Sequence, residues 1–345
     1  MFGHTSKIAS ATLVLLGLVY LLGFSSLVRS EYESLVEDRV IPLPTLDKSD
    51  YDARMLALAH VSTTTWATAS STLAWPAKAA YPNVNALLPF KRIVAYYGNF
   101  YSTAMGVLGQ YPADTMLKML ASTTAFWAAA DPKTPVLPAI QYIAVVAQGT
   151  PGRDGSYILR MPDEEIDHAL ELASRVQGIV ILDVQVGKST VERELPLLEK
   201  YLRMPQVHLA IDPEFSMKFG DAPGRVIGTM DATDVNFAAT YLAGLVQQYH
   251  LPPKVLVVHR FTQNMLTNYR KIMPLPEVQI VMDMDGFGSK DRKRGTYSRV
   301  IAPEPVQFTG VKLFYTNDVR PPADGLLTPA EVFALTPAPI YIQYQ

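Results

Sequence analysis

From residue 91 onwards, short apolar runs alternate with longer stretches of helical spacing. The apolar runs are nearly continuous and rich in β-branched residues, which is typical of strands buried on both faces of a parallel sheet. Eight such runs are present, at residues 92–98, 135–146, 178–187, 207–215, 254–261, 278–288, 310–317 and 339–345. The helical stretches between them include residues 113–130, 163–177, 190–202, 231–249 and 328–335.

Two of these helices have sequence signals for their first turn. Ser189 with Glu192, and Thr328 with Glu331, have the spacing of a capping box. Eight strand–helix units over about 255 residues match the size and order of a (β/α)8 barrel. We therefore predict an α/β fold with a TIM-type barrel over residues 91–345. A doubly wound open sheet is the alternative.

The N-terminus has a different pattern. Residues 8–28 form an uncharged apolar stretch of 21 residues, long enough as a helix to cross a hydrocarbon core of roughly 30 Å. A cleaved signal peptide is the alternative, but no A-x-A-like cleavage site is evident. Lys7 and the terminal amine favour an N-terminus inside, with the bulk of the chain exported. We predict a single transmembrane anchor over residues 1–29.

Residues 30–90 have no counterpart in the strand–helix pattern. A proline-bearing linker, Ile41-Pro42-Leu43-Pro44, precedes residues 51–73, whose first half has helical spacing and whose second half is rich in Thr, Ser and Ala. Two interpretations stay open. The segment is a spacer packed on the barrel, or residues 30–75 dock onto other membrane proteins.

Composition excludes several classes of function. The chain has 345 residues, 49% of them hydrophobic and 18% charged, which excludes disorder over most of its length. It has no cysteine, so thiol catalysis, Cys-ligated zinc and iron–sulfur clusters are excluded. A net charge of −2 argues against a nucleic-acid partner. A cluster of three or four of the carboxylates that follow the apolar runs could hold Mg²⁺ or Ca²⁺, but we predict no cofactor and no metal site.

Polar residues follow several of the apolar runs, at the strand ends where a barrel binds its ligands. Residues two apart on a strand face the same side, so each such pair can point into the barrel mouth. A carboxylate at the end of an apolar strand is costly unless it is paired, hydrogen-bonded or hydrated. The pairs are Asp183 with Gln185, Asp212 with Glu214, and Asp283 with Asp285.

Two carboxyl groups that flank a bond suit hydrolysis of a glycoside. In this interpretation Glu214 is the acid, and Asp212 and Asp283 are further catalytic carboxyls. The remaining polar and aromatic candidates would bind the ligand, the aromatics by stacking on sugar rings. They are Asp183, Gln185, His259, Asp285, Lys312, Tyr97, Tyr142 and Tyr315.

A structural interpretation of the same residues stays open. Asp212 would cap a turn before Pro213, and Asp283 and Asp285 would pair with Lys312, His259 or Arg260 in a closed ion network. No glutamate ends the seventh run, where many retaining barrel hydrolases place a nucleophile. The basic run at residues 290–294 is either a solvated loop or a contact for an anionic ligand.

From residue 75 to its end the chain resembles a family of exported bacterial proteins. Long stretches of the resemblance are FKRIVAYYGNFYSTAMGVLGQYP, LPPKVLVVHRFTQNMLTN and VQIVMDMDGFG. The resemblance implies a (β/α)8 barrel that is distantly glycosidase-like in fold, and it implies no particular activity. Phe100 and Gln110 depart from the family pattern, which has a proline and a glutamate there. If Gln110 replaces a working acid, catalysis is in doubt.

Two functions follow as hypotheses. The sequence favours a non-catalytic binding or scaffold subunit of a larger membrane assembly, for example an energy-converting complex. The anchor would lie in a bacterial inner membrane, with the barrel on the periplasmic side. The alternative is a cell-envelope glycoside hydrolase that uses the strand-end carboxylates on a glycan. Whether the protein is an enzyme stays open.

Overall fold

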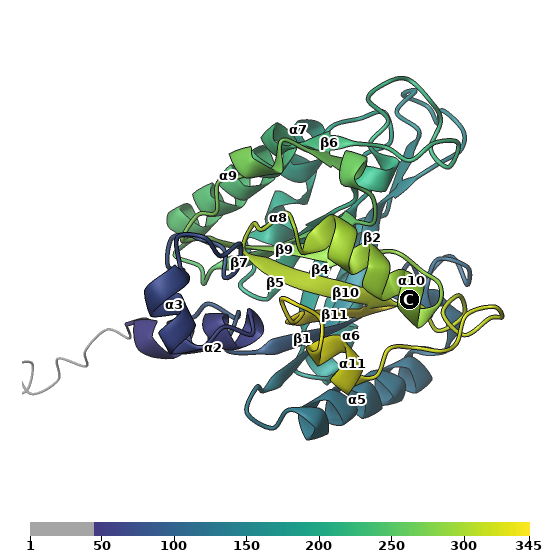
Figure 1. The fold of residues 1–345 in the computed structure, drawn as a ribbon. Coiled ribbons are helices and arrows are strands. Elements are labelled where there is room, and N and C mark those ends of the chain that lie inside the picture. Colours follow the sequence, from purple (N-terminus) through teal and green to yellow (C-terminus); the bar gives the residue numbers. More distant parts are fainter. Residues whose placement is uncertain (1–44) are drawn as a thin grey trace, which may run out of the picture. The chain divides into compact units, whose positions relative to one another are not determined.

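The protein is a closed barrel of eight parallel strands surrounded by helices (Figure 1). This computed structural model describes residues 45–345, and Leu46–Gln345 form one compact unit. The barrel closes because the first strand pairs with both the second and the last. The strands are β1 (Arg92–Gly98), β2 (Val136–Ala147), β4 (Ile179–Val184), β5 (Val207–Ile211), β7 (Lys254–Arg260), β9 (Val278–Met284), β10 (Phe308–Leu313) and β11 (Tyr341–Tyr344). The predicted barrel is confirmed, and the open sheet is excluded.

The helical segments lie between the strands, as the spacing predicts. They are α5 (Ala113–Ala130), α6 (Asp163–Arg175), α7 (Val191–Glu194), η1 (Leu195–Leu198), α8 (Glu199–Leu202), α9 (Ala232–Tyr249) and α11 (Pro329–Phe333). The capping box of Thr328 and Glu331 is confirmed. The one at Ser189 and Glu192 is wrong, because α7 begins after Thr190 and the Ser189 hydroxyl donates to Glu194 instead.

Shorter helices and strands lie within the loops that follow the barrel strands. The helix that follows β9 was not expected from the sequence, and its first part is α10. These elements are α4 (Val107–Gln110), β3 (Ile158–Arg160), η2 (Pro213–Phe215), β6 (Met230–Asp231), η3 (Gln263–Met265), β8 (Leu266–Thr267), η4 (Tyr269–Lys271), α10 (Lys290–Thr296) and the π-helix η5 (Tyr297–Ile301).

Within the described residues, two helices precede the barrel, α2 (Lys48–Leu58) and α3 (Thr63–Ala69). Tyr51 and Met55 of α2 join the apolar cluster inside the barrel, and the Ala338 N–H donates to the Leu58 carbonyl at 2.7 Å. This part of the chain therefore packs on the N-terminal end of the barrel, as the spacer interpretation expects. The helix α3, by contrast, buries none of its residues.

The predicted membrane anchor at residues 8–28, and the part of the docking segment before residue 45, lie outside the described residues. Within residues 45–345, no helix combines the length and the apolar character that crossing a membrane requires.

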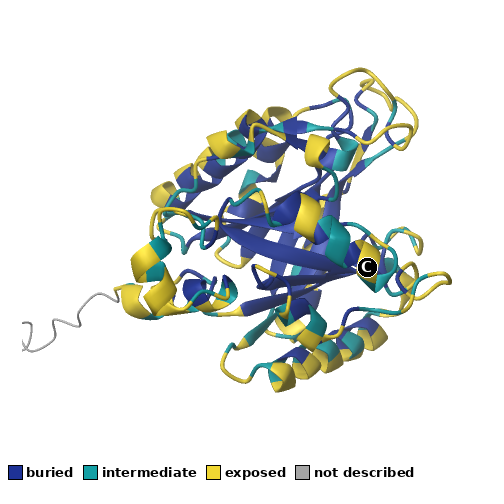
Figure 2. Cartoon of the chain, in the orientation of Figure 1, coloured by how far each residue is buried: buried dark blue, intermediate teal, exposed yellow. Residues whose placement is uncertain are grey.

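The inside of the barrel changes character along its axis. Towards the N-terminal ends of the strands it is filled mainly by apolar side chains such as Ile93, Ile181 and Val257. Towards the C-terminal ends it holds polar side chains, all buried. Figure 2 shows the strands as the most buried part of the molecule, with exposure confined to the outer faces of helices and to loops. The polar layer lies directly beneath the candidate site.

Candidate functional site

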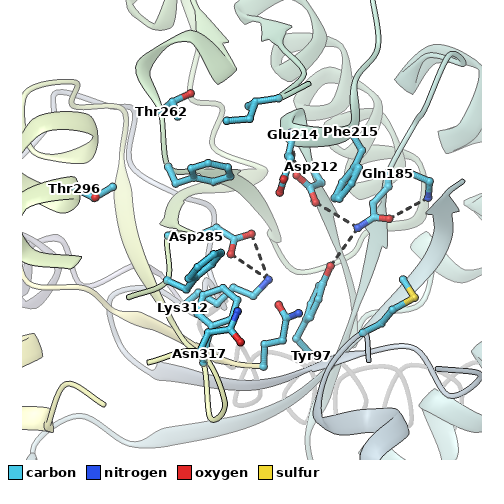
Figure 3. Close-up of a pocket in the computed structure, with 18 of the residues that line it drawn as sticks. Tyr97, Gln185, Asp212, Glu214, Phe215, Thr262, Asp285, Thr296, Lys312 and Asn317 are labelled. Carbon is cyan, nitrogen blue, oxygen red and sulfur yellow. Dashed lines mark hydrogen bonds and ion pairs between the residues drawn. The ribbon is translucent and has the colours of Figure 1, made fainter. Parts of the chain in front are cut away.

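A cavity of about 650 Å³ opens at the C-terminal ends of the barrel strands (Figure 3). This is where parallel barrels bind their ligands. Its polar lining includes Tyr97, Gln185, Asp212, Glu214, Asp285 and Lys312. Its aromatic lining includes Phe215, Phe261, Phe287 and Phe314.

The turn after β5 brings two carboxyl groups to the cavity. Asp212 accepts a hydrogen bond from the Glu214 N–H at 3.0 Å, and Pro213 occupies the first position of the short helix η2. The predicted turn cap is therefore confirmed. The Gln185 amide also donates to Asp212, at 3.4 Å. The Glu214 carboxyl has no hydrogen bond or ion pair within residues 45–345, and it projects into the cavity beside Asp212 (Figure 3).

Burial shifts the acidity of both groups. It raises the pKa of Glu214 to about 7, with a further contribution from the negative charge of Asp285. It raises the pKa of Asp212 to about 8, partly offset by the nearby His259. Near neutral pH, therefore, Glu214 readily exchanges a proton and Asp212 is mostly neutral.

Asp285 lies at the same cavity in the opposite electrostatic situation. The Lys312 ammonium lies 3.2 Å from one carboxylate oxygen of Asp285 and donates to the other at 3.3 Å. The His259 Nδ1 lies 3.2 Å from the same carboxylate. Burial would raise the pKa of Asp285, but Lys312 and His259 together outweigh burial and hold it below its usual value. Asp285 is therefore ionised at neutral pH.

A buried network lies beneath the cavity and supports it. His259 Nε2 lies 2.7 Å from Asp183, which also accepts a 2.7 Å hydrogen bond from the Gln141 amide. Burial lowers the pKa of His259, but Asp183 together with Asp283 and Asp285 raises it well above its usual value. Burial raises the pKa of Asp283, and His259 only partly opposes this. The imidazole is therefore charged, which helps to keep Asp285 ionised.

A glycine makes this network possible. A Cβ on Gly310 of β10 would lie 2.6 Å from Asp283 Oδ1 and 2.7 Å from the Tyr341 ring. Any side chain there would displace the Asp283 carboxylate. The small residue at this position thus creates the room that the polar layer occupies.

The predicted site residues divide into three groups. Those that line the cavity are Tyr97, Gln185, Asp212, Glu214, Asp285 and Lys312. Those that are fully buried and lie beneath it, rather than in its wall, are Asp183, His259 and Asp283. Tyr142 and Tyr315 belong to neither group. Tyr142 stacks on Phe100 at 4.7 Å, and Tyr315 joins a tyrosine cluster with Tyr96 and Tyr344.

Two expectations about neighbouring residues are wrong. Arg260 is no part of the ion network, because alternation along β7 turns it away from His259 and towards Glu304, at 2.5 Å. Gln110 is exposed at the end of α4 and does not line the cavity, so it gives no reason to doubt catalysis there.

The sequence missed the cavity residues that loops and the helix after β9 supply. They are Phe261, Thr262, Arg292, Thr296 and Arg299. Of these residues, Arg292 alone has a signal in the sequence, because it belongs to the basic run at residues 290–294. Within residues 45–345, no group of three or more His, Asp or Glu side chains is arranged to hold a metal ion.

Comparison with known proteins adds little. No protein-family model and no curated protein matches the chain. Among solved structures, it is similar to the crystal structure of a ruminal GH26 endo-beta-1,4-mannanase, with 12% identity and a TM-score of 0.36. The match covers 74% of this chain and spans 59% of that chain's length. A likeness this distant carries no inference about activity. By its own geometry, the protein is an eight-stranded α/β barrel. Glu214 and Asp285 lie at its mouth, and their surroundings shift their pKa values in opposite directions.

Proposed function

We propose that the cavity hydrolyses a glycosidic bond, with Glu214 as the proton donor and Asp285 as its ionised partner. One observation carries this proposal. Two carboxyl groups line one cavity, and their surroundings move their pKa values in opposite directions. Such a separation is how an active site keeps one carboxyl as an acid and another as a base at the same pH.

The reaction follows from these roles. Glu214 gives its proton to the leaving oxygen as the bond between that oxygen and the sugar carbon breaks. Water attacks the same carbon from the other side and gives a proton to Asp285. The negative charge of Asp285 also stabilises the positive charge that develops on the sugar. Lys312 holds Asp285 ionised.

The rest of the lining supports a sugar ligand. Phe261, Phe287 and Phe314 give the cavity apolar faces, and Phe287 is 50% exposed. Aromatic faces of this kind stack on the apolar faces of sugar rings, while the polar groups orient the hydroxyls. A volume of about 650 Å³ accommodates a ligand of a few sugar units.

The experiment is a turnover screen of the full chain against a panel of polysaccharides, with the Glu214→Gln variant in parallel. We expect Glu214→Gln to lower kcat by about 10²–10⁴-fold, the usual contribution of a positioned acid. Glu192→Gln, on an exposed helix position away from the cavity, is the matched control and should retain full activity. Absence of turnover on every glycan, or turnover unaffected by Glu214→Gln, would refute the proposal.

A non-catalytic role is the second candidate, and the contacts of Asp285 favour it. Lys312 contacts both oxygens of that carboxylate, which is the closed ion network of the structural interpretation. In this proposal the barrel is a binding or scaffold subunit of a membrane assembly. Residues 8–28 anchor it in a bacterial inner membrane, the barrel lies on the periplasmic side, and residues 30–75 contact partner proteins.

Affinity purification of a C-terminally tagged chain from native membranes in mild detergent tests this second candidate. Stoichiometric partners that are lost in a Trp66→Ala variant would support it, because Trp66 lies on α3, which buries none of its residues against the barrel. Purification as a monomer without partners would contradict it.

A further inference from the structure

The basic run after β9 forms the first turns of a helix, and most of its cations are already paired. Lys290 contacts Glu331 at 2.9 Å, and Arg294 contacts the same carboxylate at 2.6 Å. Lys293 is buried and contacts the buried Asp318 at 2.8 Å. These three cations hold the helix onto the barrel and have little charge to offer a ligand.

Arg292 differs from these three cations because it borders the cavity, and Arg299 on the same helix does so too. Arg292, Thr296 and Arg299 all line the cavity. Their spacing of four and three residues places them on one face of the continuous helix formed by α10 and η5. Neither arginine makes an ion pair with a carboxylate within residues 45–345. Two exposed guanidinium groups thus border the same cavity as Glu214 and Asp285.

Glycines leave room for both arginine side chains. A Cβ on Gly288 would lie 2.9 Å from Arg292 Cδ, and a Cβ on Gly295 would lie 3.0 Å from Arg299 Nη1. Glycine inside a helix is unfavourable, so Gly295 has a cost that the room for Arg299 explains. The Arg292 guanidinium also lies 5.9 Å from the centre of the Phe287 ring. Both arginine side chains therefore lie close to a glycine, and Arg292 also lies close to an aromatic ring.

The helix that carries Arg292 and Arg299 borders the cavity. Figure 3 shows Thr296, on the helix face of the two arginines, on the side of the cavity away from Gln185 and Asp212. A neutral sugar needs no cation there, whereas a planar guanidinium matches the two oxygens of a carboxylate or phosphate. We infer that the ligand is a glycan with an anionic substituent, a uronic-acid carboxylate or a phosphate, held by Arg292 and Arg299. This inference rests on the proposed glycan function and names its substrate class.

The experiment compares charged ligands with neutral counterparts. Oligogalacturonate, oligoglucuronate and oligomannuronate are each tested beside their carboxyl-reduced forms, together with a phosphorylated mannan oligosaccharide. Binding to the full-length Glu214→Gln chain is measured by calorimetry, and turnover is measured with the wild type. At least one charged ligand should bind more tightly than its neutral counterpart, and the preference should weaken with added salt. The ligand that shows it distinguishes carboxylate from phosphate.

Substitution identifies the groups responsible. Replacing both arginines, Arg292→Gln with Arg299→Gln, should weaken binding of the charged ligand by about 10–100-fold, the range for hydrogen bonds to charged groups. Binding of the neutral counterpart should not change. Arg203→Gln, at an exposed position that follows α8, is the matched control. An unchanged melting temperature excludes misfolding of the variants.

The outcomes separate this inference from the proposed function. Equal affinity for every charged and neutral pair, or a charge preference that survives the double substitution, overturns the inference and leaves hydrolysis untouched. Arginine-dependent binding of a charged glycan that is never cleaved supports the anionic ligand and refutes the catalytic proposal instead.

Discussion

The two ends of the barrel differ in the hydrogen-bond partners that they give to the side chains of Gln279 and Glu214. At the N-terminal end, the Gln279 side chain accepts hydrogen bonds from the Leu87 and Leu88 N–H groups at 2.9 and 3.0 Å. It also donates to the Leu88 carbonyl at 2.5 Å. At the C-terminal end, the Glu214 carboxyl has no such partner within residues 45–345. The Gln279 side chain is satisfied by the protein, whereas the Glu214 carboxyl faces a cavity.

The difference shows where stability and chemistry reside in this fold. A buried polar group that is fully hydrogen-bonded contributes to a unique structure, whereas one left without partners costs stability and is available to react. Substitutions at the N-terminal end of the barrel, the closed end, should therefore change stability and leave activity unchanged. Substitutions at the C-terminal end, the open end, should change activity and either raise stability or leave it unchanged.

The largest effect on stability is expected between the two ends, at His259. Its charged imidazole lies among three buried carboxyl groups, Asp183, Asp283 and Asp285. Replacing it in His259→Leu leaves these groups with Lys312 as their nearby cation, which should cost about 3–5 kcal/mol of unfolding free energy. Urea denaturation at pH 7 measures this cost. A loss below about 1 kcal/mol would mean that the network is not charged as described.

The next effect tests the closed end. Gln279→Leu removes the acceptor for the buried Leu88 N–H and the half-buried Leu87 N–H, and it should cost about 2–3 kcal/mol. The kcat/KM of the protein that remains folded should equal that of the wild type, because Gln279 lies at the far end of the strands from the cavity. Gln248→Leu, at an exposed position of α9, is the control. A fall in kcat/KM at unchanged stability would break the proposed separation.

At the open end, Asp212→Asn is expected to have a smaller effect on the unfolding free energy, and to raise it rather than lower it. Burial raises the pKa of Asp212 to about 8, so the folded state favours the neutral carboxyl. The stability that this group gives is present at low pH and is lost as pH rises through that value. Asp212→Asn stays neutral, so it should raise unfolding free energy by about 1–2 kcal/mol at pH 9. The same substitution should change it little at pH 4. Melting curves at both pH values would show equal effects if the carboxyl titrates normally.

The smallest effect concerns the arginine side of the cavity. Gly295→Ala should raise helix stability by about 0.5–1 kcal/mol and push Arg299 Nη1 away from its present position. Affinity for an anionic glycan should fall a few-fold while the melting temperature rises. If affinity is unaffected, Arg299 does not need the room that Gly295 provides.

Much of the fold follows from local patterns. The apolar runs predict the eight barrel strands, because strands buried on both faces have nearly continuous hydrophobic sequences. Strand alternation also places Asp183 with Gln185 and Asp283 with Asp285 inside the barrel. The same alternation turns Arg260 away from His259 and towards Glu304.

The depth of each residue along the barrel axis could not be predicted in the same way. Asp283 and Asp285 share a face, yet only Asp285 lines the cavity, because residues two apart lie roughly 6–7 Å apart along the strand. Tyr142 lies within β2 and packs on Phe100, and Tyr315 follows β10 and packs on other tyrosines. The cavity residues Arg292 and Arg299 come from a helix whose basic, glycine-containing sequence has no regular apolar spacing.

The central claim is that Glu214 keeps its proton near neutral pH at the open end of the barrel. Carbon-13 NMR of the glutamate carboxyls measures this directly, and the spectrum of Glu214→Gln identifies the signal that belongs to Glu214. The structure predicts a titration midpoint near 7 for that signal. A midpoint at the ordinary value of about 4.3 would contradict the assignment of Glu214 as the acid.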